Sequence, residues 1–131
     1  MRKIILLISI LALAVGGFAQ SASSLVSRSK KETDPAARVA LLTQAVKKSP
    51  KYAAAWHHRA DAYRQLKKYK KAVSDYTQAI ELTPKDAFRY YARALAYMDM
   101  EKYVLAVQDL SKAISLKKDY LDFYLARAKA N

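Results

Sequence analysis

Two adjacent histidines, His57 and His58, are the residues that most directly suggest metal binding or proton transfer. Adjacent helical residues point about 100° apart, so we expect the two not to share one ligand site. Asp99 and Glu101 lie close together, but at an expected helix end, where solvated carboxylates are ordinary. No nucleophile stands beside a base and no HExxH spacing occurs, so we expect no enzyme activity and no metal or cofactor.

The composition excludes several other kinds of chemistry. The chain has no cysteine, which rules out disulfides, thiolate metal sites and cysteine nucleophiles. Its only glycines, Gly16 and Gly17, lie near the N-terminus, so glycine-rich loops that hold phosphates cannot form further along. The 131 residues are enough for one small domain, and their richness in Ala, Lys and Leu favours helices.

The first 19 residues have the three parts of a secretory signal peptide. Arg2 and Lys3 form a basic start, segment 4–15 is apolar apart from one serine, and small residues follow up to Ala19. We expect cleavage after Ala19, a signal that enters the membrane only transiently, and a periplasmic or secreted product. The alternative is an uncleaved anchor, although the apolar run is shorter than the roughly 20 residues of a spanning helix.

Export affects how the positive charge is interpreted. The chain has 24 Lys and Arg against 11 Asp and Glu, a net charge of +13. We expect no nucleic-acid partner for an exported chain, and an anionic envelope component is the alternative partner for this charge. The structural interpretation is that lysine pairs near helix ends offset the helix dipoles and keep the surface soluble. Such pairs are Lys47-Lys48, Lys67-Lys68 and Lys117-Lys118.

The sequence repeats with a period of 34 residues and without a gap. For example, Thr43-Gln44-Ala45 matches Thr77-Gln78-Ala79, and Arg59-Ala60 matches Arg93-Ala94. This one frame of identities indicates a stack of similar structural units.

Each period reads as two helices. Trp56, Ala60 and Tyr63 recur at intervals of four and three residues, which places them on one face of the first helix. Pro50 and Pro84 follow the expected ends of second helices, where proline cannot continue the helix.

This pattern of length, helix order and Trp/Tyr, Ala, Tyr and Pro positions resembles the tetratricopeptide repeat. The resemblance implies an all-α fold, an α-solenoid of antiparallel helix pairs over residues 35–131. Residues 53–86 and 87–120 carry full repeats, and a partial repeat runs to residue 52. Residues 121–131 are a partial repeat or a cap, and the Ser/Lys-rich segment 20–34 is a lead-in or a frayed helix.

In the proteins that this chain resembles, the first helices line a concave groove that binds a peptide or helix of a partner. The matching groove positions are His57, Asp61, Arg64, Phe88, Tyr91, Leu95, Met98, Leu125 and Lys129. Those in helix 87–100 form a second apolar stripe, which is either a partner surface or core covered by the same chain.

One known use of the family is a clamp of lysine, asparagine and arginine for a C-terminal carboxylate. The positions that match this clamp hold His57, Asp61, Ala92, Asp122 and Ala126. The resemblance therefore does not extend to this clamp.

We accordingly expect an exported adaptor that binds a protein or peptide partner. The alternatives are charge-driven binding to an anionic envelope polymer or membrane surface, and the truncated repeat region of a longer envelope protein. Arginines also recur with the period, as do aspartates, and we favour structural ion pairs between helices over a basic ladder for an anionic partner. These residues are Arg59, Arg93, Arg127, Asp75 and Asp109.

Overall fold

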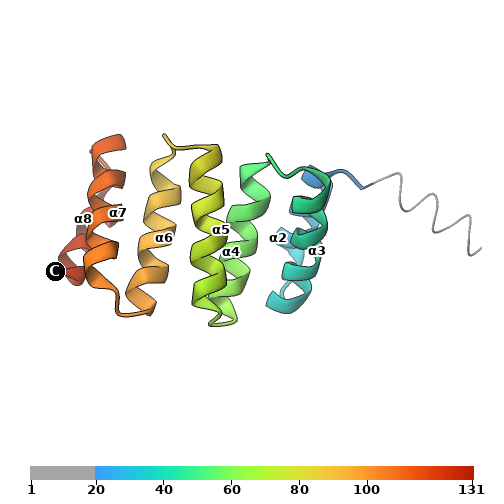
Figure 1. The fold of residues 1–131 in the computed structure, drawn as a ribbon, viewed down its shortest axis with the longest axis horizontal. Helices are drawn as coiled ribbons and strands as arrows, with labels where there is room; N and C mark the ends of the chain where they lie inside the picture. Colours follow the sequence, from blue (N-terminus) through green and yellow to red (C-terminus); the bar gives the residue numbers. More distant parts are fainter. Residues whose placement is uncertain (1–19) are drawn as a thin grey trace, which may run out of the picture.

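The computed structural model describes residues 20–131, which form seven helices joined by short turns (Figure 1). In chain order the helices are α2 Ala22–Lys31, α3 Pro35–Lys48, α4 Ala53–Gln65, α5 Tyr69–Leu82, α6 Ala87–Asp99, α7 Tyr103–Leu116 and α8 Leu121–Ala130. Consecutive helices run antiparallel and stack side by side along the length of the molecule. This arrangement confirms the expected all-α solenoid of antiparallel helix pairs.

The predicted signal peptide, residues 1–19, lies outside the described residues. Within residues 20–131, no helix is both long enough and apolar enough to cross a membrane.

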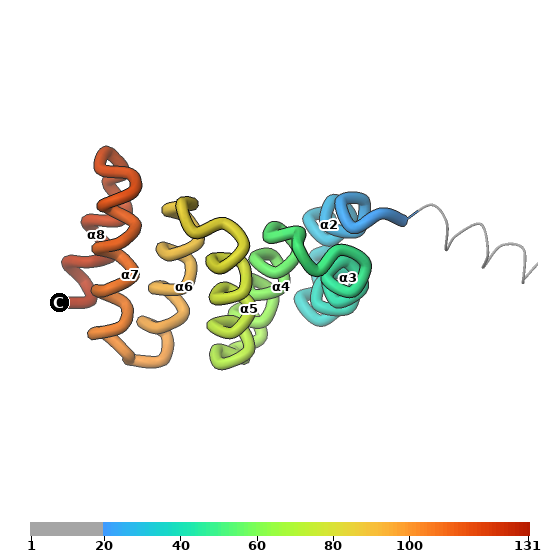
Figure 2. The backbone as a smooth tube through the Cα atoms, turned by 45° about the horizontal axis from the view of Figure 1, so that its top comes forward, coloured from blue at the N-terminus to red at the C-terminus, as the bar shows by residue number. Residues whose placement is uncertain are grey.

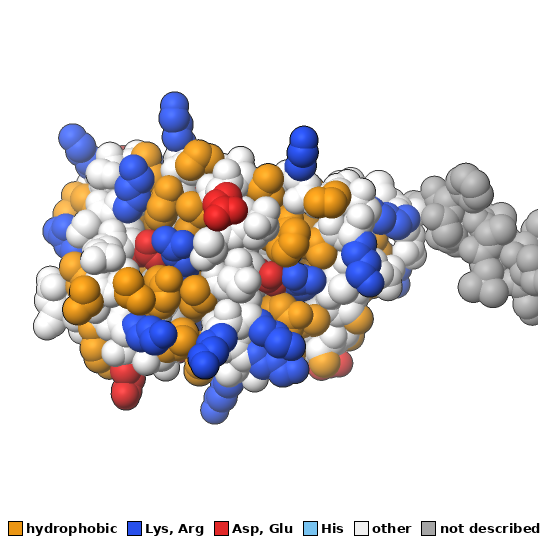
Figure 3. Space-filling model, in the orientation of Figure 1, with side chains coloured by type: hydrophobic (Ala, Val, Ile, Leu, Met, Phe, Trp, Pro, Cys, Tyr) orange, Lys and Arg blue, Asp and Glu red, His pale blue; other side chains and the backbone are white. Residues whose placement is uncertain are grey.

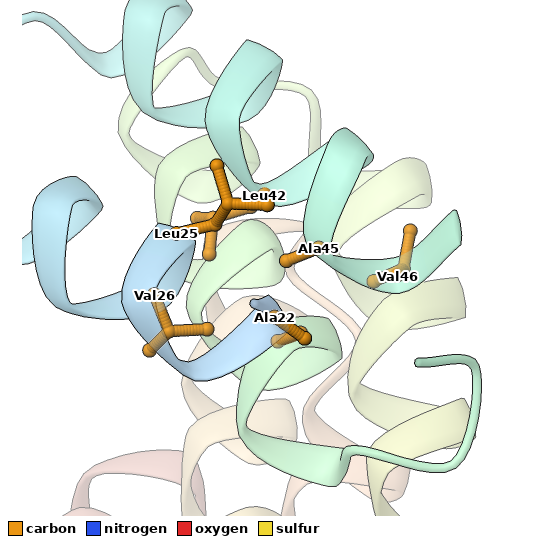
Figure 4. Packing of buried hydrophobic residues seen from close by; sticks show 7 residues of the cluster. Ala22, Leu25, Val26, Leu42, Ala45 and Val46 are labelled. Carbon is orange, nitrogen blue, oxygen red and sulfur yellow. The ribbon is translucent and has the colours of Figure 1, made fainter. Parts of the chain in front are cut away.

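Segment 20–34 contains a regular, packed helix, which differs from the expected lead-in or frayed helix. Ser21 caps α2 by accepting a hydrogen bond from the backbone N–H of Ser24 at 3.1 Å. Leu25 and Val26 are buried in a cluster with residues of α3 and α4, and Figure 4 shows Leu25 meeting Leu42 between α2 and α3. Residues 20–131 therefore contain three complete helix pairs, followed by α8.

The first helix of each pair forms the inner side of the solenoid. Helix α4 contacts both α2 and α6, and α6 also contacts α8, whereas α3, α5 and α7 do not contact one another. Figure 2 shows the same stack turned, with the pairs displaced progressively along its axis. The first helices therefore lie closer together and line the concave side.

Buried alanines allow the helices to approach closely. Ala60, Ala94 and their neighbours two residues further on are fully buried, because any larger side chain would separate the packed helices. On the second helices, Leu42, Tyr76 and Leu110 occupy positions 34 residues apart and are almost inaccessible to solvent. The period therefore specifies the core as well as the helices.

An aromatic residue near the start of α4, α6 and α8 fixes the loop before each helix. Trp56, Tyr90 and Tyr124 each donate a hydrogen bond to the backbone carbonyl six residues earlier, at 2.8, 2.9 and 2.8 Å respectively. The turns within pairs instead place Lys67 and Glu101 in the left-handed region, each with φ of 58°. Both residues follow a first helix at the position where glycine is favoured.

Ion pairs join the two helices of the second and third pairs. Arg59 donates to both carboxylate oxygens of Asp75 at 2.7 and 2.9 Å, and Arg93 donates to those of Asp109 at 2.8 and 2.7 Å. Each arginine also donates to the threonine 16 residues before it, on the preceding pair, at 3.4 and 3.1 Å. The structural interpretation of these four charged residues is confirmed.

Candidate functional site

Two adjoining pockets open on the concave side. The first, of about 460 Å³, is lined by Arg38, Asp61, Arg64, Gln65 and Asp99. The second, of about 280 Å³, is formed by α4, α6 and α8 and is lined by Arg64, Tyr91, Leu95, Met98, Asp99, Asp122, Leu125, Ala126 and Lys129. Because two residues belong to both pockets, the two form one continuous groove with a polar part and a more apolar part.

The structure brings most of the predicted groove residues together. Those that line the second pocket are Arg64, Tyr91, Leu95, Met98, Leu125 and Lys129, and Asp61 lines the first. His57 and Phe88 lie outside both pockets. The ring of Phe88 is 41% exposed at the start of α6 and packs edge-on against Tyr120, with centroids 4.9 Å apart.

The apolar stripe on α6 contributes to both the core and the groove. Tyr91, Leu95 and Met98 are half-buried and pack against the core cluster formed by α6, α7 and α8. The same three side chains line the second pocket, together with the exposed Leu125 of α8. The stripe is therefore not covered completely by helices within residues 20–131.

Two groove residues, Arg38 and Asp99, were missed by sequence reasoning. Arg38 comes from α3, a second helix, and its Nη1 donates to Gln65 Oε1 at 2.8 Å. Asp99 accepts a hydrogen bond from Arg64 Nε at 2.5 Å, which corrects its interpretation as an ordinary solvated acid. Its separation from Arg64 is one period plus one residue, a spacing that places the two at matching ends of neighbouring first helices.

Three side chains converge on Asp61 near the middle of α4. His57 Nε2 and His58 Nδ1 lie 3.5 and 3.6 Å from the same carboxylate oxygen, and the Tyr76 hydroxyl donates to the other oxygen. The expectation that the two histidines point too far apart to share a site is wrong for this carboxylate. The physical reason is that Asp61 follows them by four and three residues, which places all three on neighbouring positions of the helix surface.

The pKa values of this cluster follow from its burial and its contacts. Burial lowers the pKa of His57 below its ordinary 6.5, opposed by the charge of Asp61. Burial acts to raise the pKa of Asp61, but the His58 hydrogen bond, the His57 charge and the Tyr76 hydrogen bond together outweigh it and lower that pKa. Burial, followed by the charge of Asp61, raises the pKa of Tyr76. The cluster is thus an ionised aspartate beside a protonated tyrosine hydroxyl, and within residues 20–131 no group of potential ligands is placed to hold a metal ion.

Solved structures similar to this chain are small helical repeat domains. The second TPR of Spaghetti (RPAP3), bound to the HSP90 peptide SRMEEVD, has a TM-score of 0.71 and 28% identity over 75% of this chain and 94% of its own. The first TPR of Spaghetti, bound to the same peptide, has a TM-score of 0.81 and 23% identity over 86% and 91% of the two chains. A crystal structure of MamA has a TM-score of 0.82 and 21% identity over 91% and 71%.

The sequence comparisons agree with this architecture. No curated protein matches the chain significantly. Two family models match, one described as "TPR repeat" over residues 60–101 and one described as "Tetratricopeptide repeat" over residues 89–120. Together with the 34-residue period and the stacked helix pairs, these matches show that the chain is a tetratricopeptide repeat protein.

Proposed function

We propose that this protein is an adaptor that binds a peptide or helical segment of another protein in its concave groove. The observation that carries the proposal is the pocket of about 280 Å³ to which α4, α6 and α8 all contribute. A site formed jointly by three successive first helices depends on the stacking of the repeats, as a groove for an elongated ligand requires.

The second pocket has the features of an anchor site for an apolar side chain. Tyr91, Leu95, Met98 and Leu125 supply an apolar wall, and Arg64 and Lys129 border it. Burying an apolar side chain against such a wall supplies affinity, while a few charged groups at the edge fix the orientation of the ligand.

The polar pocket is suited to the backbone of the same ligand. Arg38 and Arg64 provide hydrogen-bond donors, and Asp61 and Asp99 provide acceptors, so the formal charges of its ionised groups balance. A peptide backbone offers both acceptors and donors and carries no charge, which fits a balanced site. We therefore infer a ligand with an apolar anchor residue next to a segment of mixed polarity.

Similar proteins support a peptide ligand but not an acidic one. The two TPR domains of Spaghetti were solved with the HSP90 peptide SRMEEVD. In this chain Asp61, Asp99 and Asp122 line the groove, and they would repel the acidic residues of such a peptide. The missing lysine, asparagine and arginine clamp supports the same inference.

The partner that we propose is an exported protein. This step rests on residues 1–19, which have the basic start, apolar segment and small-residue end of a signal peptide. The adaptor would then act in the periplasm or outside the cell. Mass spectrometry of the protein purified from its native host would test this proposal, which requires a mature N-terminus at Gln20.

A matched pair of leucines on α8 tests the groove. Leu125 is 51% exposed and lines the second pocket, whereas Leu121, four residues earlier on the same helix, is 67% exposed and lies outside it. Peptides selected from a random library on residues 20–131 should bind Leu125→Ala about 10-fold more weakly, because an anchor contact is lost. The Leu121→Ala control should bind them as the original protein does.

The same binding assay gives the results that would contradict the proposal. Selected peptides that bind Leu125→Ala and the original protein equally well would exclude the second pocket as the anchor site. Binding of SRMEEVD as tight as that of the selected peptides would show that the aspartates do not exclude acidic ligands.

A further inference from the structure

Positive charge is concentrated at the turn between α4 and α5. Lys67, Lys68, Lys70 and Lys71 are all exposed, and together with Tyr69 and Met100 they surround an open pocket of about 490 Å³. Figure 3 shows Lys and Arg side chains gathered at the lower edge of the molecule, where Figure 1 places this turn. Within residues 20–131, none of these four lysines forms a salt bridge with an acid.

These lysines oppose the electrostatics of the helix that they begin. Lys68 is the N-cap of α5 without a side-chain hydrogen bond, and the first turn of α5 contains no acid. A helix N-terminus favours negative charge, so cations in this turn reduce the stability of the helix. By contrast, Asp34 and Asp86 cap α3 and α6 with side-chain hydrogen bonds. Because the lysines do not help α5 to form, binding of an anionic partner is the better explanation for them.

The neighbouring turn on the same edge presents apolar side chains. One period after Lys70 and Lys71, the chain has Val104 and Leu105 at the start of α7. Val104 is 74% exposed, the highest value among the large exposed hydrophobic residues of the described chain, and Leu105 and Tyr103 are exposed as well. Met100, on the turn before α7, lines the lysine pocket and so connects the two sets of residues.

We propose that this edge binds the surface of a lipid bilayer that contains anionic head groups. We define the lysine edge by the residues Lys67, Lys68, Lys70, Lys71, Met100, Tyr103, Val104 and Leu105. Lysines near an anionic bilayer gain electrostatic energy, while exposed aliphatic and tyrosine side chains favour the boundary between head groups and acyl chains.

The apolar part of the edge decides between a bilayer and a soluble polyanion. A polyanion would bind the lysines but would gain nothing from Val104 or Leu105, because it has no apolar interior. Glu101 lies between the two turns and lowers the local charge, which weakens the case for an interaction based on charge alone. The proposal does not depend on peptide binding, since the lysines lie outside the two groove pockets.

Vesicle binding of two triple variants with the same change in net charge tests the location. Residues 20–131 contain all seven packed helices and serve as the test protein, with circular dichroism as the check that each variant is folded. The variant Lys67→Glu/Lys68→Glu/Lys70→Glu should bind vesicles of phosphatidylglycerol and phosphatidylcholine about 100-fold more weakly. The control Lys51→Glu/Lys85→Glu/Lys118→Glu, at exposed lysines in the loops between pairs, should lose no more than about 5-fold.

A second pair of variants tests the apolar contribution. Val104→Ser should weaken vesicle binding about 5-fold because apolar surface no longer enters the bilayer, and it should leave binding to heparin, a soluble polyanion, unchanged. Leu121→Ser, at an exposed leucine away from the edge, should leave vesicle binding unchanged. Equal binding to vesicles of phosphatidylcholine alone, or equal losses for the two triple variants, would overturn the proposal. Vesicle binding that ignores Val104→Ser would also overturn it and would assign the lysines to a polyanion.

Discussion

The second helix pair, α4 and α5, and the third, α6 and α7, have the same internal framework but different surfaces. Each has a bidentate Arg–Asp ion pair, an aromatic residue bonded to the preceding loop, and fully buried alanines on the first helix. Their groove positions differ completely, with His57, Asp61 and Arg64 on α4 and Tyr91, Leu95 and Met98 on α6. The comparison teaches that the repeat conserves what joins helices, so function is to be sought where the two pairs differ.

The first pair shows that even the ion pair can be replaced. Leu25 and Leu41 occupy the positions that correspond to Arg59 and Asp75 one period later. Leu25 is fully buried, and Leu41 packs against the same cluster. An apolar pair therefore fits the position in this fold, and the ion pair is one of two solutions within one chain.

The largest expected effect comes from removing one partner of an ion pair. Asp75→Ala would leave the Arg59 guanidinium, only 15% exposed, without its acid, and we expect the free energy of unfolding to fall by about 3 kcal/mol. Asp109→Ala should behave alike if the two pairs share one framework. Urea denaturation measures both values.

A double variant sharpens this comparison. Arg59→Leu/Asp75→Leu copies the first pair, leaves no unpaired charge, and should lose less than about 1 kcal/mol. A double variant as unstable as Asp75→Ala would show that the second pair cannot accept the solution of the first.

The framework was predictable from the sequence because it repeats. Residue identities 34 positions apart located the helix pairs, the buried alanines and the ion pairs. Helix α2 was less evident because its Ser and Lys residues obscure the spacing of Ala22, Leu25, Val26 and Ser29, which are all buried. That spacing of three, one and three residues was the available signal for the helix.

The candidate site was only partly predictable because it depends on differences between repeats. The helical face identified Tyr91, Leu95 and Leu125, since position on a first helix decides whether a residue faces the groove. Arg38 escaped because it reaches the groove from a second helix, and no rule of spacing within first helices could include it. The contact of both histidines with Asp61 depends on side-chain rotamers, which the helical angle between adjacent residues does not determine.

The next effect concerns pH and distinguishes α4 from α6. The pKa of His57 is lower in the folded state than its ordinary 6.5, so protonation favours unfolding. The stability due to neutral His57 is fully present above pH 6.5 and declines as the pH falls towards the folded-state pKa. His57→Tyr, which copies Tyr91, should flatten the thermal stability profile between about pH 7 and pH 5. Parallel profiles for the two proteins would exclude His57 as the group responsible.

A smaller effect tests a feature that the second and third pairs share. Lys67 and Glu101 have φ of 58°, a conformation that costs little for glycine and more for other residues. Lys67→Gly and Glu101→Gly should each raise the free energy of unfolding by about 0.5–1 kcal/mol, measured by urea denaturation. A gain at only one of the two sites would mean that the turns are not equivalent.

The smallest expected effect separates the outer edges of the two pairs. Lys70→Glu replaces an unfavourable cation with a favourable anion in the first turn of α5 and should add about 0.6 kcal/mol to the free energy of unfolding. Val104→Glu, at the corresponding site of α7, only adds the anion and should contribute about 0.3 kcal/mol. A loss of stability in Lys70→Glu, measured by thermal unfolding, would show that this lysine supports the fold.

The two arginines that form ion pairs also make the stack cooperative. Arg93 bonds both to Asp109 in its own pair and to Thr77 in the pair before it, and Arg59 bridges to α3 in the same way. Opening one pair therefore leaves a polar group of its neighbour without a partner, which raises the free energy of a boundary between folded and unfolded repeats. The array should consequently open as one unit, with similar hydrogen-exchange protection in the cores of α4, α5, α6 and α7, instead of unravelling one repeat at a time.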